Sequence, residues 1–245
     1  MKKIAVIGFG RFGQLITSLL LTHTSLDVLV ISSKPQSHLD RVTFGRWEDL
    51  ANVEAAIIAV PISAFEETIK KAAQHLSPTA LCIDVCSVKS YPVKVMLDHM
   101  PATMSILAAH PMFGPDSFQK NQGIQGFNLI MYPVRIDVEV YQQIVSFCQK
   151  SGLQVHELTP SDHDRYAAYS QLYTFCIGQL THRLQLATTP IDTYWYAFFL
   201  EQSTAVTNDG SQLFKDIFTY NPFAKEFLFS LKKSFSELVS ELEST

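Results

Sequence analysis

A glycine-rich turn near the N-terminus constrains the fold of this chain more than any other feature. The apolar run 4–7 is short, continuous and rich in β-branched residues, which is typical of a strand buried on both faces of a parallel sheet. Gly8, Gly10 and Gly13 follow at once in a G-x-G-x-x-G pattern, and residues 14–21 continue with helical spacing. Strand, glycines and helix in this order form the dinucleotide-binding fingerprint in the context that it requires.

Each glycine of the fingerprint has its own expected role. Gly8 lets the chain turn tightly, Gly10 lets the backbone approach a pyrophosphate, and Gly13 lets helix and strand pack closely. The helix that follows offers unpaired N–H groups and the positive end of its dipole to the phosphates. A glycine turn without a ligand is the alternative, and the flanking strand and helix disfavour it.

Short apolar strands alternate with amphipathic helices over the first two thirds of the chain. This alternation predicts right-handed βαβ units and a doubly wound, mostly parallel sheet of the Rossmann type. Further strands are expected at 27–31, 55–60, 81–85, 105–108, 127–132 and 153–158, and helices at 64–76 and 138–151.

The end of the second strand indicates which dinucleotide is bound. An NAD site usually has Asp or Glu there to bond the ribose 2′-hydroxyl, whereas this chain has Ser32, Ser33 and Lys34. Two hydroxyls and an ammonium suit a 2′-phosphate, so NADP is predicted in preference to NAD; an ordinary polar turn is the alternative. The predicted cofactor-binding residues are Gly8, Gly10, Arg11, Phe12, Gly13, Ser32, Ser33, Lys34, Val60 and Pro61.

Two polar residues follow neighbouring strands of the predicted sheet. His110 comes directly after an apolar run and just before Pro111 and Gly114, which predicts an imidazole held by a stiff turn at a strand end. Ser87 follows the preceding strand, where a serine is more often a turn or cap residue. Because the carboxyl edge of a doubly wound sheet brings such strand ends together, Ser87 and His110 can face one ligand.

The β-strand pattern ends near Pro160, and the rest of the chain has helical patterns. We therefore predict a dinucleotide-binding domain at 1–160 and a smaller all-helical domain at 161–245. The segment 159–162 predicts a helix start with Ser161 or Asp162 as the N-cap. Interruptions are expected near 188–190 and 221–222, where prolines occur.

The first helix of this second domain has an unusual face. Positions 163, 167, 170 and 171 share one side, and they carry polar and small residues where a core helix would show Leu or Ile. This favours a wet, functional cleft, with a helix packed through a few satisfied polar groups as the alternative.

Aromatic residues are dense in the last segment of the chain. A domain of about 85 residues cannot easily bury all of them. Since aromatics are enriched at subunit interfaces, the segment predicts a homodimer, with a monomeric aromatic core as the alternative. These residues are Tyr194, Trp195, Tyr196, Phe198, Phe199, Phe214, Phe218, Tyr220, Phe223, Phe227 and Phe229.

Composition excludes several classes of partner. The net charge is −4 and no run of Lys or Arg occurs, which argues against nucleic acid and anionic membranes. The four cysteines lack a CxxC pair and are read as reduced, so a cytoplasmic location is expected. The apolar run at the N-terminus is too short for a signal peptide or a membrane span. No metal site is predicted.

With these residues in view, the chain resembles the prephenate/arogenate dehydrogenase family over nearly its whole length, and most of all the single-domain plant-type arogenate dehydrogenases. The most specific part is His-Pro-Met-Phe-Gly-Pro-Asp-Ser at 110–117. The other parts are Gly8–Gly13, Asp84–Lys89, His163–Arg165 with Ala167, Ala168, Ser170 and Gln171, and Thr189–Ile191.

The resemblance implies an oxidative decarboxylation of arogenate or prephenate in tyrosine biosynthesis. Hydride leaves ring C4 for the nicotinamide and CO₂ is lost as the ring becomes aromatic. The resemblance assigns His110 to polarising the 4-hydroxyl and Ser87 to a supporting hydrogen bond, with Gly114 also at the substrate. Two other readings are a Rossmann reductase acting on a small keto acid or imine, and a non-catalytic NADP-binding sensor.

The chain departs from the family at the expected carboxylate-binding arginine. A Phe-x-Asp-x-(Thr/Ser)-Arg segment is missing between Tyr194 and Phe218, and Gln171 stands where many members have His. Gln171, Arg165 or a residue of a dimer partner are the candidates for holding the substrate. The Ser-Gln pair and the NADP-type second strand, both shared with plant-type enzymes, favour arogenate over prephenate.

Overall fold

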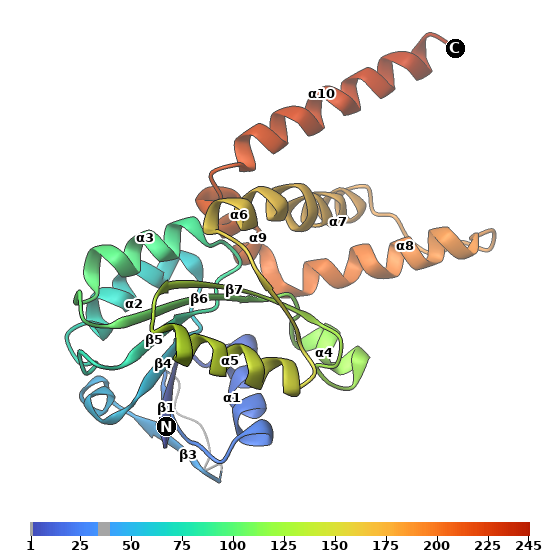
Figure 1. Ribbon diagram of the computed structural model, residues 1–245. Coiled ribbons are helices and arrows are strands. Elements are labelled where there is room, and N and C mark those ends of the chain that lie inside the picture. The colour runs from blue at the N-terminus through green and yellow to red at the C-terminus, as the bar shows by residue number, and fades with distance from the viewer. Residues whose placement is uncertain (1, 34–39) are drawn as a thin grey trace. The chain divides into compact units, whose positions relative to one another are not determined.

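The structure is a computed structural model that describes residues 2–33 and 40–245 (Figure 1). The predicted cofactor residue Lys34 lies outside the described residues. The chain divides into two compact units, 1–160 and 161–245, and each is described by itself. None of the described helices is both long and apolar enough to cross a membrane.

The first unit is built on a sheet in which eight strands are described. Their order is β3-β2-β1-β4-β5-β6-β7-β8, and all pairs are parallel except β6 with β7. This order reverses between β1 and β4, which confirms the predicted doubly wound, mostly parallel sheet. The strands are β1 (Lys3–Ile7), β2 (Asp27–Ile31), β3 (Val42–Gly45), β4 (Ala55–Ile58), β5 (Leu81–Asp84), β6 (Ser105–Pro111), β7 (Asn128–Arg135) and β8 (Gln154–Glu157).

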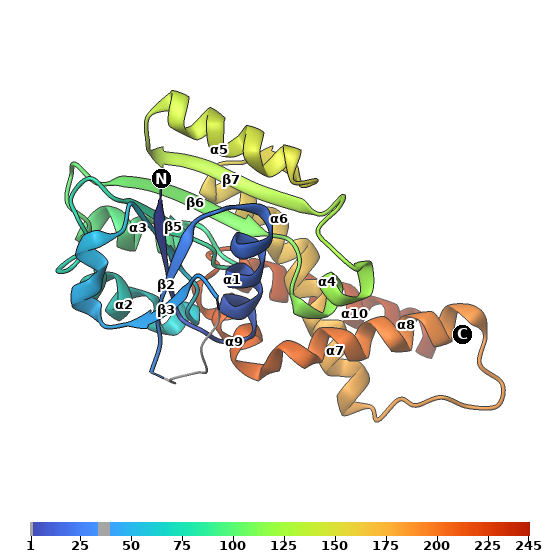
Figure 2. The same ribbon diagram turned by 90° about the horizontal axis from the view of Figure 1, so that it is seen from below.

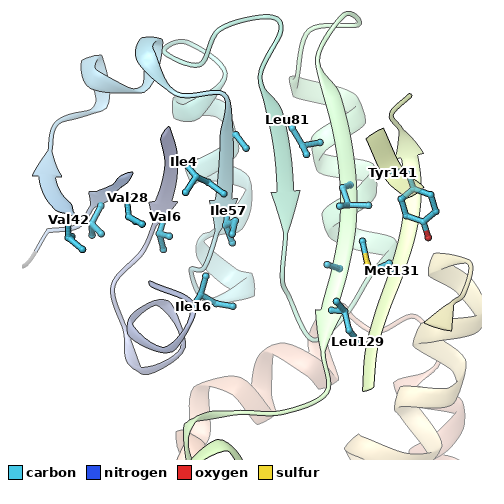
Figure 3. Close-up of a cluster of buried hydrophobic side chains, with 14 residues drawn as sticks. Ile4, Val6, Ile16, Val28, Val42, Ile57, Leu81, Leu129, Met131 and Tyr141 are labelled. Carbon is cyan, nitrogen blue, oxygen red and sulfur yellow. The ribbon is translucent and has the colours of Figure 1, made fainter. Parts of the chain in front are cut away.

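Helices cover both faces of this sheet. Ile16 of α1 and Tyr141 of α5 pack on the face that carries Val6 and Met131 (Figure 3). Met96 of α3 lies against the other face, with its sulfur 3.9 Å from that of Cys82. The helices are α1 (Arg11–His23), α2 (Phe65–Ala72), α3 (Ser90–His99), α4 (Pro115–Asn121) and α5 (Val138–Lys150).

Several predicted boundaries move in the structure. The predicted strands 55–60 and 81–85 end at Ile58 and Asp84, because the residues after them leave the ladder to form loops at the sheet edge. The predicted helix 64–76 is shorter, since α2 ends at Ala72. The short strand β3 and the helices α3 and α4 were not predicted, because their runs are too short for a clear period.

The second unit is entirely helical in its described secondary structure. The helices α7 and α8 lie side by side (Figures 1 and 2). The interruptions expected near 188–190 and 221–222 are confirmed, because they separate α7 from α8 and α9 from α10. The elements are α6 (Pro160–Ala167), the π-helix η3 (Ala168–Leu172), α7 (Tyr173–Arg183), α8 (Tyr194–Ala205), the 3₁₀ helix η4 (Val206–Asp209), α9 (Gly210–Tyr220) and α10 (Ala224–Glu243).

The predicted N-cap of the first helix in this unit was wrong. Ser161 and Asp162 lie inside α6, which begins at Pro160. A proline is favoured at the first helical position because its missing N–H would have no intrahelical partner there and its φ is already helical. The proline therefore belongs to the helix and does not precede it.

Candidate active site

The glycine turn after β1 has the geometry that its sequence predicts. Gly8 has a φ of +101°, and its N–H donates to the carbonyl of Ile31 at 2.9 Å. A Cβ on Gly8 would lie 2.3 Å from the oxygen of Ala59, and a Cβ on Gly13 would lie 2.1 Å from the oxygen of Gly8. These two glycines are therefore required by the packing of the turn against β4 and α1.

Gly10 differs from its two neighbours in the fingerprint. A Cβ on Gly10 would meet no atom of the described residues within 4 Å. Gly10 is also the N-cap residue of α1, so the positive end of this helix opens onto the same space. Open space beside a helix N-terminus, at the strand-order reversal of the sheet, fits a dinucleotide pyrophosphate.

The other predicted cofactor residues lie around this turn. Ser32 is half-buried and Ser33 exposed, directly after β2, which pairs with β1. Val60 and Pro61 follow β4 on the opposite side of β1. The structure thus brings the described members of the predicted set to the carboxyl ends of three adjacent strands.

Arg11 links the glycine turn to the segment after His110. Its guanidinium forms an ion pair with the carboxylate of Asp116 at the start of α4, and both side chains are nearly half exposed. Gly114 is the N-cap of α4, and its N–H donates to Ser117 Oγ at 2.9 Å. Because this N–H already has a partner, the backbone of Gly114 has no unpaired N–H to offer a substrate.

His110 lies inside a strand, which corrects the prediction of a stiff turn. β6 continues to Pro111 because antiparallel β7 pairs with it, with His110 opposite Ile130. Side chains alternate along a strand, so His110 projects to the face opposite the cluster that contains Leu107 and Ala109. The imidazole is held by sheet pairing and is 3% exposed.

Ser87 lies in the loop that follows β5, the strand beside β6. In the register of these two strands Asp84 lies opposite Ala108. Ser87 comes three residues after Asp84, and His110 comes two residues after Ala108. Ser87 is half-buried. Ser87 and His110 therefore come from the same edge of the sheet, on neighbouring strand ends.

Lys89 and Asp84 form a buried ion pair at this edge of the sheet. Lys89 Nζ donates to both carboxylate oxygens of Asp84 at 2.6 Å and to the carbonyl of Ala109 at 2.5 Å. Asp84 also accepts the N–H of Cys86 at 2.8 Å. Burial raises the pKa of the Asp84 carboxyl, and the ammonium of Lys89 opposes this shift. Sequence reasoning missed the pair, although a charged residue at the end of a buried strand was a signal for it.

The polar helix of the second unit contains a π-helical turn. This turn, η3, places Gln171 so that its side-chain oxygen is buried without a hydrogen-bond partner among the described residues. Buried polar atoms normally have a partner, and π-turns occur often at functional sites. The wider turn also corrects part of the predicted face, because Ser170 is exposed and donates to its own helix at Tyr166.

The remaining predicted residues of this helix differ in their surroundings. His163 is buried, with Nδ1 2.9 Å from the Asp164 carboxylate. Arg165 is exposed, and its guanidinium lies 5.1 Å from the centre of the Phe223 ring. A guanidinium stacked on an aromatic ring keeps its N–H donors available for an anion.

The fold and the glycine turn define a Rossmann-type dinucleotide-binding unit followed by a helical unit. The model of the prephenate dehydrogenase nucleotide-binding domain matches residues 38–129, and that of the TYRAAT1-like C-terminal domain matches residues 180–245. The chain is similar to the prephenate/arogenate dehydrogenase family.

Two plant proteins are similar to this chain over nearly all of its length. Arogenate dehydrogenase 1, chloroplastic, of Arabidopsis thaliana is 31% identical over 98% of this chain, which spans only 39% of that protein. Arogenate dehydrogenase 2, chloroplastic, of the same plant is 29% identical over 98% of this chain and 70% of its own length.

Two solved structures share the fold. Prephenate dehydrogenase from A. aeolicus, in complex with hydroxyphenyl propionate and NAD⁺, has a TM-score of 0.75 and 17% identity over 100% of this chain and 90% of that one. Synechocystis arogenate dehydrogenase has a TM-score of 0.70 and 19% identity over 99% of this chain and 92% of that one.

Proposed function

We propose that this chain catalyses the NADP-dependent oxidative decarboxylation of arogenate to tyrosine, or of prephenate to 4-hydroxyphenylpyruvate. The observation that carries the proposal is the shared sheet edge of Ser87 and His110, near a glycine turn with open space at Gly10. Similarity to the prephenate/arogenate dehydrogenase family supports the same reaction.

His110 and Ser87 have separate tasks in this proposal. The neutral imidazole of His110 accepts the proton of the ring 4-hydroxyl as the substrate is oxidised, which contributes about 10²- to 10⁴-fold in rate. Ser87 supports this hydroxyl with a hydrogen bond and so orients it toward His110. When bound, NADP supplies the hydride acceptor. Strand pairing of His110 with β7, next to the pairing of Ala108 with β5, suits a group that must hold one orientation.

Gln171 is our candidate for the other end of the substrate. Its buried side-chain oxygen can only accept a hydrogen bond, and it lacks a partner among the described residues. The side chain of arogenate carries an ammonium, which donates, whereas that of prephenate carries a keto group, which accepts. This difference supports arogenate as the preferred substrate, with Arg165 as the candidate partner for a substrate carboxylate.

NADP is the proposed cofactor, with NAD used less well. The support is the pair of hydroxyls at Ser32 and Ser33, together with the ammonium of Lys34, where an NAD site usually has a carboxylate. Gly8, Gly10, Arg11, Phe12 and Gly13 would surround the pyrophosphate, and Val60 and Pro61 would line the other side.

A homodimer through the helical unit is also proposed. Tyr194 and Trp195 are 74% and 73% exposed, and Phe229 is 71% exposed. Aromatic side chains this open to water in one unit favour burial against a second copy. A cytoplasmic location stays a prediction, supported by four cysteines that form no disulfide in the described part of the chain; the two plant relatives are named chloroplastic.

The deciding experiment is a turnover assay with the purified chain. Arogenate or prephenate is supplied with NADP or NAD, and reduced cofactor, tyrosine and hydroxyphenylpyruvate are measured. We expect tyrosine formation with arogenate and NADP to be fastest. Turnover with neither substrate would reject the proposal. NADP binding without turnover would then favour a sensor, and reduction of a small keto acid or imine would favour another reductase.

A further inference from the structure

The buried pair of Lys89 and Asp84 connects the two strand ends of the candidate site. The side chains of the two residues are 3% and 0% exposed. Asp84 is the last residue of β5, and it accepts the N–H of Cys86, which directly precedes Ser87. Lys89 reaches across to the carbonyl of Ala109, which directly precedes His110. One ion pair thus contacts the backbone beside both proposed active-site residues.

The stability of the fold does not by itself account for an ion pair at this place. Desolvation offsets most of the attraction between buried charges, and well-packed apolar side chains of similar volume are often as stabilising. Apolar side chains could neither accept the Cys86 N–H nor donate to the Ala109 carbonyl. What the ion pair adds is directional bonding at two backbone positions.

The register of β5 and β6 places the pair on the same side of the sheet as the imidazole. Asp84 lies opposite Ala108, and matched residues of a parallel pair point to the same face. Side chains alternate along β6, so His110 points to that face too, about 6.6 Å along the strand from Ala108. The Asp84 carboxylate of the ion pair therefore starts from a position two residues before His110 along the strand direction, on the same face of the sheet.

We propose that Lys89 is a positioning residue, which sets His110 and Ser87 in place by tying the end of β5 to the end of β6. This inference rests on the proposed function, because it assumes the roles given there to His110 and Ser87. A misplacement of about 1 Å costs about 100-fold in turnover. Loss of the tie should therefore lower kcat, while the glycine turn beyond β4 keeps its affinity for the dinucleotide.

The test compares three variants of the full chain with the parent protein. Lys89→Met removes the ammonium, and the paired variant Asp84→Asn with Lys89→Met removes both charges, so that no carboxylate is left buried alone. The matched control is Lys94→Met in α3, where Lys94 is 74% exposed and pairs with Asp98 on the surface. Circular dichroism identifies the variants that fold.

Two measurements are made on each folded variant. The first is the set of imidazole chemical shifts of His110 by NMR in the dinucleotide-free protein, assigned by their loss in His110→Asn. The second is kcat, KM and NADP affinity. We expect both Lys89 variants to shift the His110 signals and to lower kcat about 100-fold, with NADP affinity retained. Lys94→Met should match the parent in every measurement.

Unchanged His110 signals in the folded paired variant would overturn the proposal, whatever the activity. The same signals separate this proposal from the proposed function. If the parent protein turns over neither arogenate nor prephenate, the function is rejected, and the His110 signals still decide whether Lys89 positions this residue.

Discussion

The two units differ in how far their large apolar side chains are buried. In the first unit the strands β1, β4 and β6 are buried on both faces, and a large side chain such as Phe65 of α2 is completely buried. In the second unit many large apolar side chains face water, and buried positions include the polar His163, Asp164 and Asp216. The first unit therefore has a complete core of its own. The second unit exposes apolar side chains of the kind that a partner subunit covers, and it buries several polar groups.

This contrast separates what each unit contributes. Strands that are hydrogen-bonded to their neighbours keep the backbone segments at the sheet edge in fixed positions. This suits a cofactor-binding turn and the proposed catalytic imidazole. Helices with a π-turn, and with a buried oxygen that has no hydrogen-bond partner in the described part of the chain, suit recognition of a variable part of the substrate. The predictions below test this division, beginning with the largest expected effect.

Removing the proposed base should have the largest effect. His110→Asn keeps a polar side chain but loses the imidazole nitrogen that accepts the proton, so kcat should fall about 10²- to 10⁴-fold. NADP affinity, measured by calorimetry, should stay at the parental value, because the fingerprint is untouched. The matched control is His156→Asn in β8, where the imidazole bonds to Asn128 on the surface. Equal kcat in His110→Asn and the parent would remove His110 from the mechanism.

The glycine turn allows its structural and binding roles to be separated. Gly13→Ala forces a Cβ to within 2.1 Å of a backbone oxygen and should cost about 3 kcal/mol in unfolding free energy, or about 10 °C in Tm. Gly10→Ala meets open space, so its Tm should be parental while NADP binding weakens.

Thermal unfolding and NADP titration of the two variants check this pair. A Gly10→Ala variant that binds NADP like the parent protein would show that the pyrophosphate lies elsewhere. A parental Tm for Gly13→Ala would contradict the close packing of the turn.

Replacing an exposed aromatic side chain of the helical unit should weaken the proposed dimer without unfolding the unit. Trp195→Ser removes an aromatic side chain that is 73% exposed, and should weaken the dimer about 30-fold, as expected for an interface residue worth about 2 kcal/mol. Analytical ultracentrifugation measures the dimer constant, and Leu97→Ser in α3 is the control, because Leu97 is also exposed but lies in the first unit. A monomeric parent protein would contradict the dimer.

The smallest expected effect concerns the choice of dinucleotide. Ser32→Asp places a carboxylate beside the proposed 2′-phosphate, and like charges about 4 Å apart in water repel by about 1 kcal/mol. The ratio of kcat/KM with NADP to that with NAD should therefore fall about fivefold. Ser32→Asn, which is isosteric with Asp but uncharged, is the control that separates the effect of the charge from the loss of the Ser32 hydroxyl. An unchanged ratio would show that the 2′-phosphate does not lie at this strand end.

Local sequence patterns were informative where one segment decides its own structure. β2 begins and ends at the predicted residues, and the fingerprint glycines have the predicted tight turn and close packing. The secondary structure or burial of a residue could not be predicted in this way where it depends on a segment far away in the sequence. His110 belongs to a strand because β7 pairs with it, and no pattern around His110 reports that pairing. Similarly, Ser170 was placed on the polar inward face by an ideal helical period, which the π-turn breaks.

The sequence by itself determined the doubly wound class of the first unit, the position of the cofactor turn and the helical character of the second. These follow from the spacing of apolar residues and from glycines, whose effects act within a few residues. Only the tertiary structure decided that Lys89 bonds Asp84 and the Ala109 carbonyl, and that the Gln171 oxygen is buried without a described partner. Burial and long-range hydrogen bonds depend on which strands and helices become neighbours, and that arrangement exists only in the folded chain.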